Sequence, residues 1–518
     1  MYLTQPLHKA LLERPRDTAI VFGRRRHTFT QLTERVSRFA AVLKELGLQQ
    51  GDRVGMMSLN SDRYVEYLHG VWWAGGVINP VNIRWTASEV AYGLDDCDTQ
   101  ILLVDEAFRA MAGELRGVSR CLRTVIYAGD GDVPEGMLGY EALMAAAVPV
   151  DDAGRCGDDL AAIMYTGGMT GLPKGVMLTH GSLYVDLLAS LAAVPRPGNA
   201  VGVQAAPMFH IGGCSLSLQL MMRLAKQVIL PAFDEVAILQ AIQSERGSEI
   251  FLVPTMIKRF IEHPRFAEFD VSSLAMVLYG AAPIDAALLA QAMKALPETE
   301  FAQFYGMTEL SPSIVSLAPW YHKPEAGHPE RLRSAGRPFP IAEVRIVDED
   351  GKPVPNGTVG EIVARGPMVM AGYWNKPEET ARALRGGWMH TGDGGTMDDD
   401  GFIYVVDRIK DMIVSGGENV YSAEVENTIA QMPEVSMCAV IGVPDDQWGE
   451  RVHAVIVLRA GCELTPDDVI AHSRRLIAGY KCPRSVEFRA ELPLSAAGKL
   501  LKYRLREPFW AGRDRKVN

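Results

Sequence analysis

The chain has 518 residues, too many for one hydrophobic core, so two or more domains are expected. Its 52 Lys and Arg against 63 Asp and Glu give a formal charge of −11, which argues against a primary nucleic-acid binder. Seven cysteines stand singly without a CxxC pair, as in reduced cytoplasmic proteins, and disulfides or a zinc site are not expected. Without a signal peptide or a long apolar run, the chain is predicted to be cytoplasmic with no integral membrane segment.

The first third of the chain alternates predicted helices and strands. A helix is expected over residues 30–47, with apolar residues on one face and a stop at Gly47. A strand over 52–58, a helix over 63–76 and a strand over 99–106 follow. This alternation predicts parallel sheets covered by helices, an α/β fold.

Further buried strands end in glycine or proline turns. They are predicted over residues 159–166, 248–254, 273–280 and 299–306. In open α/β sheets, ligands bind beyond the carboxyl ends of parallel strands. The turns at 165–175, 279–283 and 305–309 are therefore expected to lie at neighbouring strand ends and to converge on one crevice.

The stretch "YTGGMTGLPKG", residues 165–175, is rich in glycine and carries a single lysine, Lys174. Bare backbone N–H groups can approach an anion closely, so phosphate is the expected ligand. The loop is not a P-loop, because Pro173 precedes Lys174 and Gly175 follows it where that motif needs Ser or Thr.

The pattern changes from about Ala342. Asp-Gly and Asn-Gly turns between alternating residues predict antiparallel hairpins, and a compact α+β set follows Lys410. We therefore predict a large N-terminal domain (1–407) with a β-rich subregion at about 335–407, a hinge at about 408–410, and a C-terminal domain (411–518).

Five ordered motifs carry a family resemblance. They are residues 165–175, 305–309, "HTGD" (390–393), "DRIKDMIVSGGENVYSAEVE" (407–426) and Gly498–Lys499. Together they resemble the adenylate-forming superfamily of acyl-CoA synthetases, peptide-synthetase adenylation domains and firefly luciferase, and most closely bacterial fatty-acid or aryl-acid CoA ligases. The resemblance implies two steps: a carboxylate attacks the α-phosphate of ATP to form an acyl-adenylate, and a thiol then displaces AMP.

The resemblance also implies roles for particular residues. Lys174 and the loop would hold the β,γ-phosphates, Thr308 the α-phosphate, Glu309 a Mg²⁺ ion and Asp393 the ribose. The catalytic residues implied are Lys499, Thr308, Glu309, Lys174 and His210. The ATP- and AMP-binding residues implied are Thr166, Gly167, Gly168, Met169, Thr170, Gly171, Lys174, Gly280, Ala281, Ala282, Gln303, Tyr305, Gly306, Met307, Thr308, Asp393, Arg408 and Lys499.

The C-terminal domain would act as a mobile lid. Lys499 would reach the first-step site, and rotation at Lys410 would then bring Ser415, Gly416 and Gly417 to the CoA channel. Tyr421 and Trp448 are expected to be core residues.

The acid would be bound by His210, Ile211, Gly212, Gly213, Gly280 and Met307. The residues at positions 212–215, Gly-Gly-Cys-Ser, are all small, which favours a roomy site for a medium- or long-chain fatty acid. The alternatives are an aryl acid of the cinnamate or benzoate type, or transfer of the acyl group to a separate carrier protein. ATP, Mg²⁺ and CoA are the expected cofactor and co-substrates, and a homodimer is allowed because dimers are common among similar enzymes.

Two positions depart from the family pattern. Met169 replaces a hydroxyl residue of the loop, which removes a phosphate donor worth about 1–3 kcal/mol. It is the only support for a remote alternative, a non-catalytic nucleotide-binding scaffold. Val414 replaces a lysine found in luciferase and 4-coumarate–CoA ligases, which separates this chain from those branches.

Overall fold

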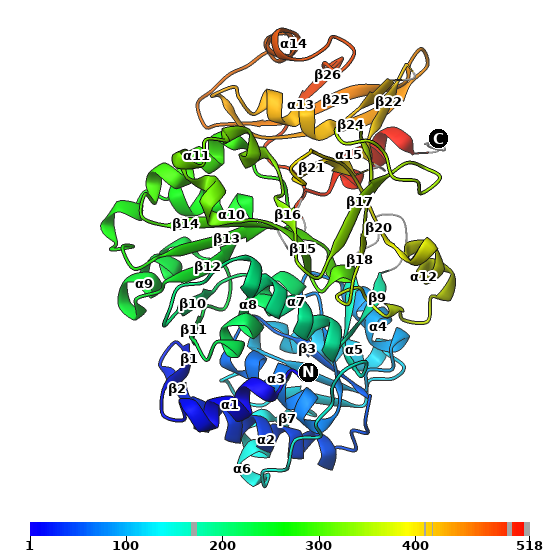
Figure 1. Ribbon diagram of the computed structural model, residues 1–518. Coiled ribbons are helices and arrows are strands. Elements are labelled where there is room, and N and C mark those ends of the chain that lie inside the picture. Colours follow the sequence, from blue (N-terminus) through cyan, green and yellow to red (C-terminus); the bar gives the residue numbers. More distant parts are fainter. Residues whose placement is uncertain (167–172, 409–410, 417, 495–499, 512–518) are drawn as a thin grey trace.

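The computed structural model describes residues 1–166, 173–408, 411–416, 418–494 and 500–511 (Figure 1). Two large, mostly parallel sheets with helices on both faces form the N-terminal part, and two smaller sheets follow, one antiparallel and one mostly antiparallel. The predicted α/β class is confirmed, including the antiparallel hairpins after Ala342.

The first large sheet holds the strands that end in the 279–283 and 305–309 turns. Its central strands, β10 to β14 and β1, are parallel, and antiparallel strands close both edges. In order across the sheet, the nine described strands are β16 (Arg337–Pro338), β15 (Ser313–Leu317), β14 (Glu300–Gly306), β13 (Met276–Gly280), β12 (Glu249–Leu252), β10 (Val201–Gln204), β11 (Lys226–Ile229), β1 (Thr18–Phe22) and β2 (Arg25–Thr28).

The second large sheet contains the strand that leads into the glycine-rich loop. In order, its eight described strands are β19 (Gly372–Tyr373), β9 (Lys174–Thr179), β8 (Leu160–Thr166), β4 (Val77–Pro80), β3 (Arg53–Met57), β5 (Ile101–Val104), β6 (Thr124–Tyr127) and β7 (Leu138–Gly139). The prediction that the three turns end neighbouring strands is wrong, because β8 lies in a different sheet from β13 and β14. Periodicity along one strand carries no information about which sheet the strand joins.

Helices fill three layers around the two sheets. Those packed in the large core on the sheets' inner faces are α1 (Gln5–Glu13), α2 (Phe29–Glu45), α3 (Asp62–Ala74), α6 (Tyr140–Ala146), α7 (His180–Ala193) and α8 (Ile211–Met222). The outer face of the first sheet carries α9 (Glu235–Glu245), α10 (Pro254–Ile261) and α11 (Ala286–Ala295). The outer face of the second carries α4 (Ala87–Asp96) and α5 (Arg109–Val118). Helix α12 (Pro377–Ala383) contacts β19.

Local sequence explains where these helices begin and end. The Thr28 hydroxyl accepts a hydrogen bond from the Gln31 N–H, and the Gln31 side chain accepts one from the Thr28 N–H, a capping box that starts α2. Just beyond its end, Gly47 takes a φ of 92°, which a side chain would disfavour. Short 3₁₀ turns connect other elements: η1 (Glu106–Phe108), η2 (Phe266–Glu268), η3 (Thr308–Leu310), η4 (Pro319–His322), η5 (Pro324–Ala326), η6 (Pro329–Arg333) and η7 (Arg385–Gly387).

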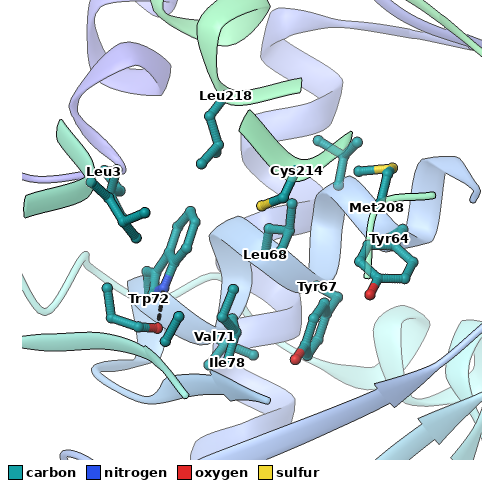
Figure 2. Close-up of a cluster of buried hydrophobic side chains, with 14 of the residues drawn as sticks. Leu3, Tyr64, Tyr67, Leu68, Val71, Trp72, Ile78, Met208, Cys214 and Leu218 are labelled. Carbon is teal, nitrogen blue, oxygen red and sulfur yellow. Dashed lines mark hydrogen bonds between the residues drawn. The ribbon is translucent and has the colours of Figure 1, made fainter. Parts of the chain in front are cut away.

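Helix α3 joins the two sheets through the middle layer. Figure 2 shows Trp72 and Leu68 of α3 beside Cys214 and Leu218 of α8, all of them buried. The Trp72 indole N–H donates to the Ala161 carbonyl at 2.8 Å, where the β8–β9 register shifts. This bond satisfies a carbonyl at an irregular point of the ladder and fixes β8 just before the glycine-rich loop.

Two smaller sheets complete the fold. A four-stranded antiparallel sheet is made of β17 (Glu343–Val347), β18 (Gly360–Arg365), β20 (Met389–Met397) and β21 (Ile403–Arg408). The last sheet consists of β23 (Glu418–Val420), β22 (Ile413–Ser415), β25 (Gly449–Leu458), β24 (Val435–Asp445) and β26 (Ser485–Phe488). It packs on one face against α13 (Ser422–Ile429) and α14 (Pro466–Leu476), and on the other against α15 (Lys502–Trp510).

Among the described residues, none of the helices combines the length and apolar character that crossing a bilayer requires.

Trp72→Phe should lower the free energy of unfolding by about 2–4 kcal/mol, because it leaves the buried Ala161 carbonyl unpaired and a small cavity behind. Urea denaturation followed by fluorescence would measure it at the first unfolding transition. Trp320→Phe is the matched control: its side chain is 54% exposed and the change should cost less than about 0.5 kcal/mol. Equal losses in the two variants would contradict this role of Trp72.

Candidate functional site

The glycine-rich loop spans the turn between β8 and β9. Thr166 and Lys174 are directly opposed in this antiparallel pair, so they form the base of the loop. The predicted residues Gly167, Gly168, Met169, Thr170 and Gly171 lie outside the described residues. The base alone positions one hydroxyl and one cation at the same end of the second sheet.

A chain of contacts links Lys174 to Glu309 through Tyr373. The Lys174 Nζ lies 4.9 Å from the centre of the Tyr373 ring, and the Tyr373 hydroxyl donates to Glu309 Oε1 at 2.9 Å. Tyr373 reaches this position because β19 pairs with β9 two residues from Lys174. Tyr373 could not be predicted from the sequence, because only this strand pairing reveals its position.

Glu309 is a buried carboxylate, 6% exposed, in the turn η3 that begins at Thr308. Its main-chain carbonyl accepts a hydrogen bond from Met370 N–H at 2.9 Å. Burial and the nearby carboxylate raise the pKa of Tyr373, so its hydroxyl stays protonated as a donor. A single anchored carboxylate fits Mg²⁺, which is commonly bound by one or two carboxylates together with substrate phosphates.

Tyr305 and Asp393 form a second pair. The Tyr305 hydroxyl donates to Asp393 Oδ2 at 2.9 Å, which joins the first large sheet to β20 of the four-stranded sheet. Asp393 is 8% exposed, and its N–H donates to the Thr391 hydroxyl at 3.1 Å. Across the strands, Asp393 pairs with Arg408 at the end of β21. The phenol ring and the carboxylate predicted to bind adenosine therefore lie together.

The two strand-end turns of the first sheet are constrained by their own backbones. A Cβ on Gly280 would lie 2.2 Å from the Phe304 carbonyl oxygen, and one on Gly306 would lie 2.1 Å from that of Pro312. Ala281 has a φ of 65°, a left-handed conformation that costs about 1–2 kcal/mol in a residue with a side chain. Such strain at a predicted ligand site is typical of functional turns.

The remaining predicted residues of these turns are accounted for as follows. Gln303 Oε1 accepts from the Tyr279 hydroxyl at 3.4 Å, Met307 immediately precedes η3, and Ala282 is half-buried. Gln303 lies within β14, whereas Ala282 follows β13, and Met307 and Thr308 follow β14.

His210 occupies the N-cap position of α8, which begins at Ile211, without a capping hydrogen bond from its side chain. The two glycines that follow differ in what they require. A Cβ on Gly213 would lie 2.2 Å from the Pro207 carbonyl oxygen, so glycine is needed there for packing. A Cβ on Gly212 would meet the Phe251 ring at 3.4 Å, an ordinary contact. Gly212 therefore leaves room beside Phe251 that a larger side chain would fill.

In the C-terminal domain, the predicted CoA-binding turn begins at Ser415, which is buried, and Gly416. Gly416 has a φ of 64°, and a Cβ there would lie 2.6 Å from the Trp448 ring. Its N–H donates to the Trp448 carbonyl at 2.8 Å. Trp448 thus holds the turn in place. Glycine is required at position 416 both by the left-handed φ and by the close contact with the Trp448 ring. Gly417 lies outside the described residues.

A partly buried polar network lies beside the predicted hinge. Asp407 accepts a hydrogen bond from Ser422 N–H at 2.7 Å and so caps α13. Lys502 is bonded to the Ser422 hydroxyl and lies 2.9 Å from Glu426. Burial opposes its charge, but Glu426 and Asp407 raise the pKa of Lys502. These contacts of Asp407 and Lys502 were not predicted from the sequence, because they depend on segments far apart in the chain.

Lys410 and Lys499 lie outside the described residues, and only the strand position of Arg408 is described.

Comparisons with known proteins agree with this geometry. The model of the AMP-binding enzyme family matches residues 7–374, and that of the AMP-binding enzyme C-terminal domain matches residues 424–499. A feruloyl-CoA synthase of Amycolatopsis sp is 39% identical over 97% of this chain and 98% of its own. A fatty acid–[acyl-carrier-protein] ligase of Streptomyces coeruleorubidus is 34% identical over 97% and 96%. The structure of ATP-bound MatB from Rhodopseudomonas palustris aligns with a TM-score of 0.89 and 30% identity over 99% of both chains.

Tyr373→Phe tests the link between Lys174 and Glu309. The ring remains beside Lys174, but the carboxylate loses a buried donor, so binding of ATP in the presence of Mg²⁺ should weaken about tenfold, as measured by titration calorimetry.

Tyr404→Phe is the control, because the Tyr404 hydroxyl also donates to a carboxylate, that of Asp398 at 3.2 Å. It should leave binding unchanged. Unchanged binding in Tyr373→Phe as well would refute the role given to this contact.

Proposed function

The chain belongs to the AMP-binding enzyme family, and we propose that it is an ATP-dependent acid–CoA ligase. In the first step, a carboxylate oxygen attacks the α-phosphorus of ATP, and the bond to pyrophosphate breaks. In the second step, the CoA sulfur attacks the acyl carbon, AMP leaves with the oxygen it gained, and the thiol proton is released. The relatives named as CoA and carrier-protein ligases support this class, and the ATP-bound neighbour supports ATP as a substrate.

The observation that carries the proposal is that a chain of three residues, Lys174–Tyr373–Glu309, and the pair Tyr305–Asp393 converge on one region. The first step brings two anions together, so it requires cations and N–H donors near the phosphates. We assign Lys174, Thr166 and the glycine-rich loop to the β,γ-phosphates and Thr308 to the α-phosphate. Glu309 would hold Mg²⁺, which supplies positive charge to the phosphates when bound.

The second pair would hold the adenosine. Tyr305 offers a ring face to the purine, and Asp393 offers a carboxylate to the ribose hydroxyls, as acidic residues do in other nucleotide sites. The Tyr305–Asp393 bond sets the ring relative to the carboxylate before the ligand arrives. The small residues Gly280, Ala281 and Ala282 would border the base, and Arg408 would support Asp393.

The C-terminal domain would serve both steps as a lid hinged at 408–410. Lys499 would balance charge on the α-phosphate and the carboxylate in the first step. Ser415, Gly416 and Gly417 would line the CoA path in the second. The contact of Asp407 with Ser422, which also bonds Lys502, supports this position for the hinge.

Two classes of acid have support. Gly212 leaves space for a fatty acyl chain or for a ring, and the relatives include a feruloyl-CoA synthase and a fatty-acid ligase. Transfer to a carrier protein is the second candidate, because one relative is named for it. The cytoplasmic location and a homodimer stay predictions.

Release of AMP with free CoA tests the ligase directly. The enzyme with ATP, Mg²⁺ and an active acid should release AMP on addition of CoA. AMP release only with a phosphopantetheinyl carrier protein would favour the carrier alternative. Absence of acid-dependent pyrophosphate exchange across a broad acid panel would favour the non-catalytic scaffold.

Lys499→Ala should reduce acid-dependent pyrophosphate–ATP exchange by about 100- to 1000-fold, because one charge is lost from the first transition state. Thioester formation from supplied acyl-adenylate should stay within about twofold of the original enzyme, since Lys499 acts only in the first step.

Lys352→Ala, which removes a lysine that is 74% exposed, serves as the control and should change neither step. Equal loss of both steps in Lys499→Ala would contradict the alternating lid.

A further inference from the structure

Two phenylalanine rings face α7 and α8 from the first large sheet. Phe251 of β12 and Phe304 of β14 pack at the edge of a buried cluster that includes Leu216 of α8 and Leu278 of β13, yet both remain partly exposed. Gly280, which is expected to contact the acid, pairs with Phe304 across the strands. On α8, Gly212 approaches Phe251. The acid proposed above would therefore lie against these two rings.

The helices opposite present polar side chains to this apolar sheet face. We call them the polar cluster: Asp186 and Ser190 on α7, Ser215 and Gln219 on α8, and Arg196 after α7. All five are buried. Ser215 and Gln219 lie three and seven residues beyond Gly212, on the same face of α8 and up to about 10 Å deeper. Most buried side chains in such a layer are apolar, so a polar set here needs a partner.

Asp186 is the member whose whole polar group lacks hydrogen bonds, whereas Arg196 lacks one only at Nε. Its side chain is 0% exposed, and neither carboxylate oxygen has a hydrogen-bond partner in the described part of the chain. Burial raises the pKa of Asp186 well above its ordinary value, and the nearby Ser313 N–H offsets only part of this rise. Ser313 pairs with Gly306 of the nucleotide-facing turn, which places Asp186 at the site's edge. A neutral carboxyl there can donate one hydrogen bond and accept another.

The charged side chain of Arg196 lies at the end of the polar cluster that is farthest from Gly212. Arg196 donates to Gln219 Oε1 at 2.7 Å, and its guanidinium lies 5.3 Å from the centre of the Phe304 ring. Gln219 in turn donates to Ser215 and Ser190, at 3.2 and 3.3 Å. Behind Arg196 lies the fully buried Glu249, 3.6 Å from Nε.

Arg196 and Arg223 also line a surface hollow of about 270 Å³ on the outer side. The guanidinium of Arg196 thus lies between the Phe304 ring and the Glu249 carboxylate. A long hydrocarbon tail would have to end against this charged group or displace it, which is unfavourable. A short, flat acid would fill the space between the rings and α8 without reaching it.

We propose that the preferred acid is an aromatic acid whose ring carries a hydroxyl group, and that Asp186 recognises this hydroxyl. The phenol would donate to one oxygen of the Asp186 carboxyl and accept from the other, while the ring packs on Phe251 and Phe304. Asp186 is then a specificity-determining residue, and Gln219 with Arg196 bounds the length of the acid. This inference rests on the proposed ligase function.

The test compares acids that differ only in the hydroxyl group. Acid-dependent pyrophosphate exchange is measured with cinnamate, 3-hydroxycinnamate, 4-hydroxycinnamate and decanoate. A site built to bond a hydroxyl discriminates strongly against the analogue lacking it, so one hydroxycinnamate should exceed cinnamate at least about tenfold in kcat/KM. Decanoate should be weaker than either hydroxycinnamate.

Variants of Asp186 test whether this residue discriminates between hydroxycinnamate and cinnamate. Asp186→Leu should reduce the hydroxycinnamate-to-cinnamate ratio to about one, and Asp186→Asn, which keeps a donor and an acceptor, should retain most of the ratio. Ser217→Ala is the matched control on α8, because the Ser217 hydroxyl donates to Gln227 at 2.7 Å instead of joining the polar cluster. It should leave the ratio unchanged.

The outcomes separate this inference from the function beneath it. Activity with decanoate above all cinnamates, or an unchanged ratio in Asp186→Leu, overturns the inference and leaves the ligase standing. No exchange with any of a broad acid panel overturns the ligase itself. If Asp186→Leu does not fold, the four-acid comparison in the original enzyme still decides, because a ratio near one is sufficient to refute the role of a hydroxyl.

Discussion

The hydrogen bond between Tyr373 and Glu309 is the contact on which the arrangement of the site depends. It joins β19, paired beside Lys174, to the turn that follows β14, and so connects the two large sheets at their functional edge. In a chain with a formal charge of −11, a site for a polyphosphate and a carboxylate must be assembled from a few local cations. Tyr373 keeps one of these cations beside the buried carboxylate.

Around this contact, the strand ends of the first large sheet and the helices of the middle layer make different contributions. Gly280 and Gly306 have no Cβ, so the Phe304 and Pro312 carbonyl groups can pack directly against them at the ends of β13 and β14. Helix α8 begins beside them at His210, and the helical layer behind it carries both the apolar core around Trp72 and the polar cluster around Gln219. Helix α8 thus contributes to both, with α3 in the core around Trp72 and with α7 in the polar cluster.

Much of this could be predicted from the sequence, because its signals are local. Hydrophobic periodicity located β12, β13 and β14 of the first large sheet and β3, β5 and β8 of the second. Asp-Gly and Asn-Gly turns located the hairpins of β17 to β21, and the ordered motifs indicated the family. Two features could not be predicted. The separation of β8 from β13 and β14 depends on long-range pairing, and the roles of Tyr373, Asp186 and Asp407 depend on which distant segments lie beside them. A tyrosine or aspartate in a single sequence carries no mark of such neighbours.

The central claim is that a carboxylate oxygen joins the α-phosphorus of ATP at this site. An acid labelled with ¹⁸O in both carboxylate oxygens tests it most directly, with mass spectrometry of the products after one turnover with ATP, Mg²⁺ and CoA. The account predicts one ¹⁸O in AMP, none in pyrophosphate, and one remaining in the thioester. AMP without the label, or ADP as the nucleotide product, would contradict it.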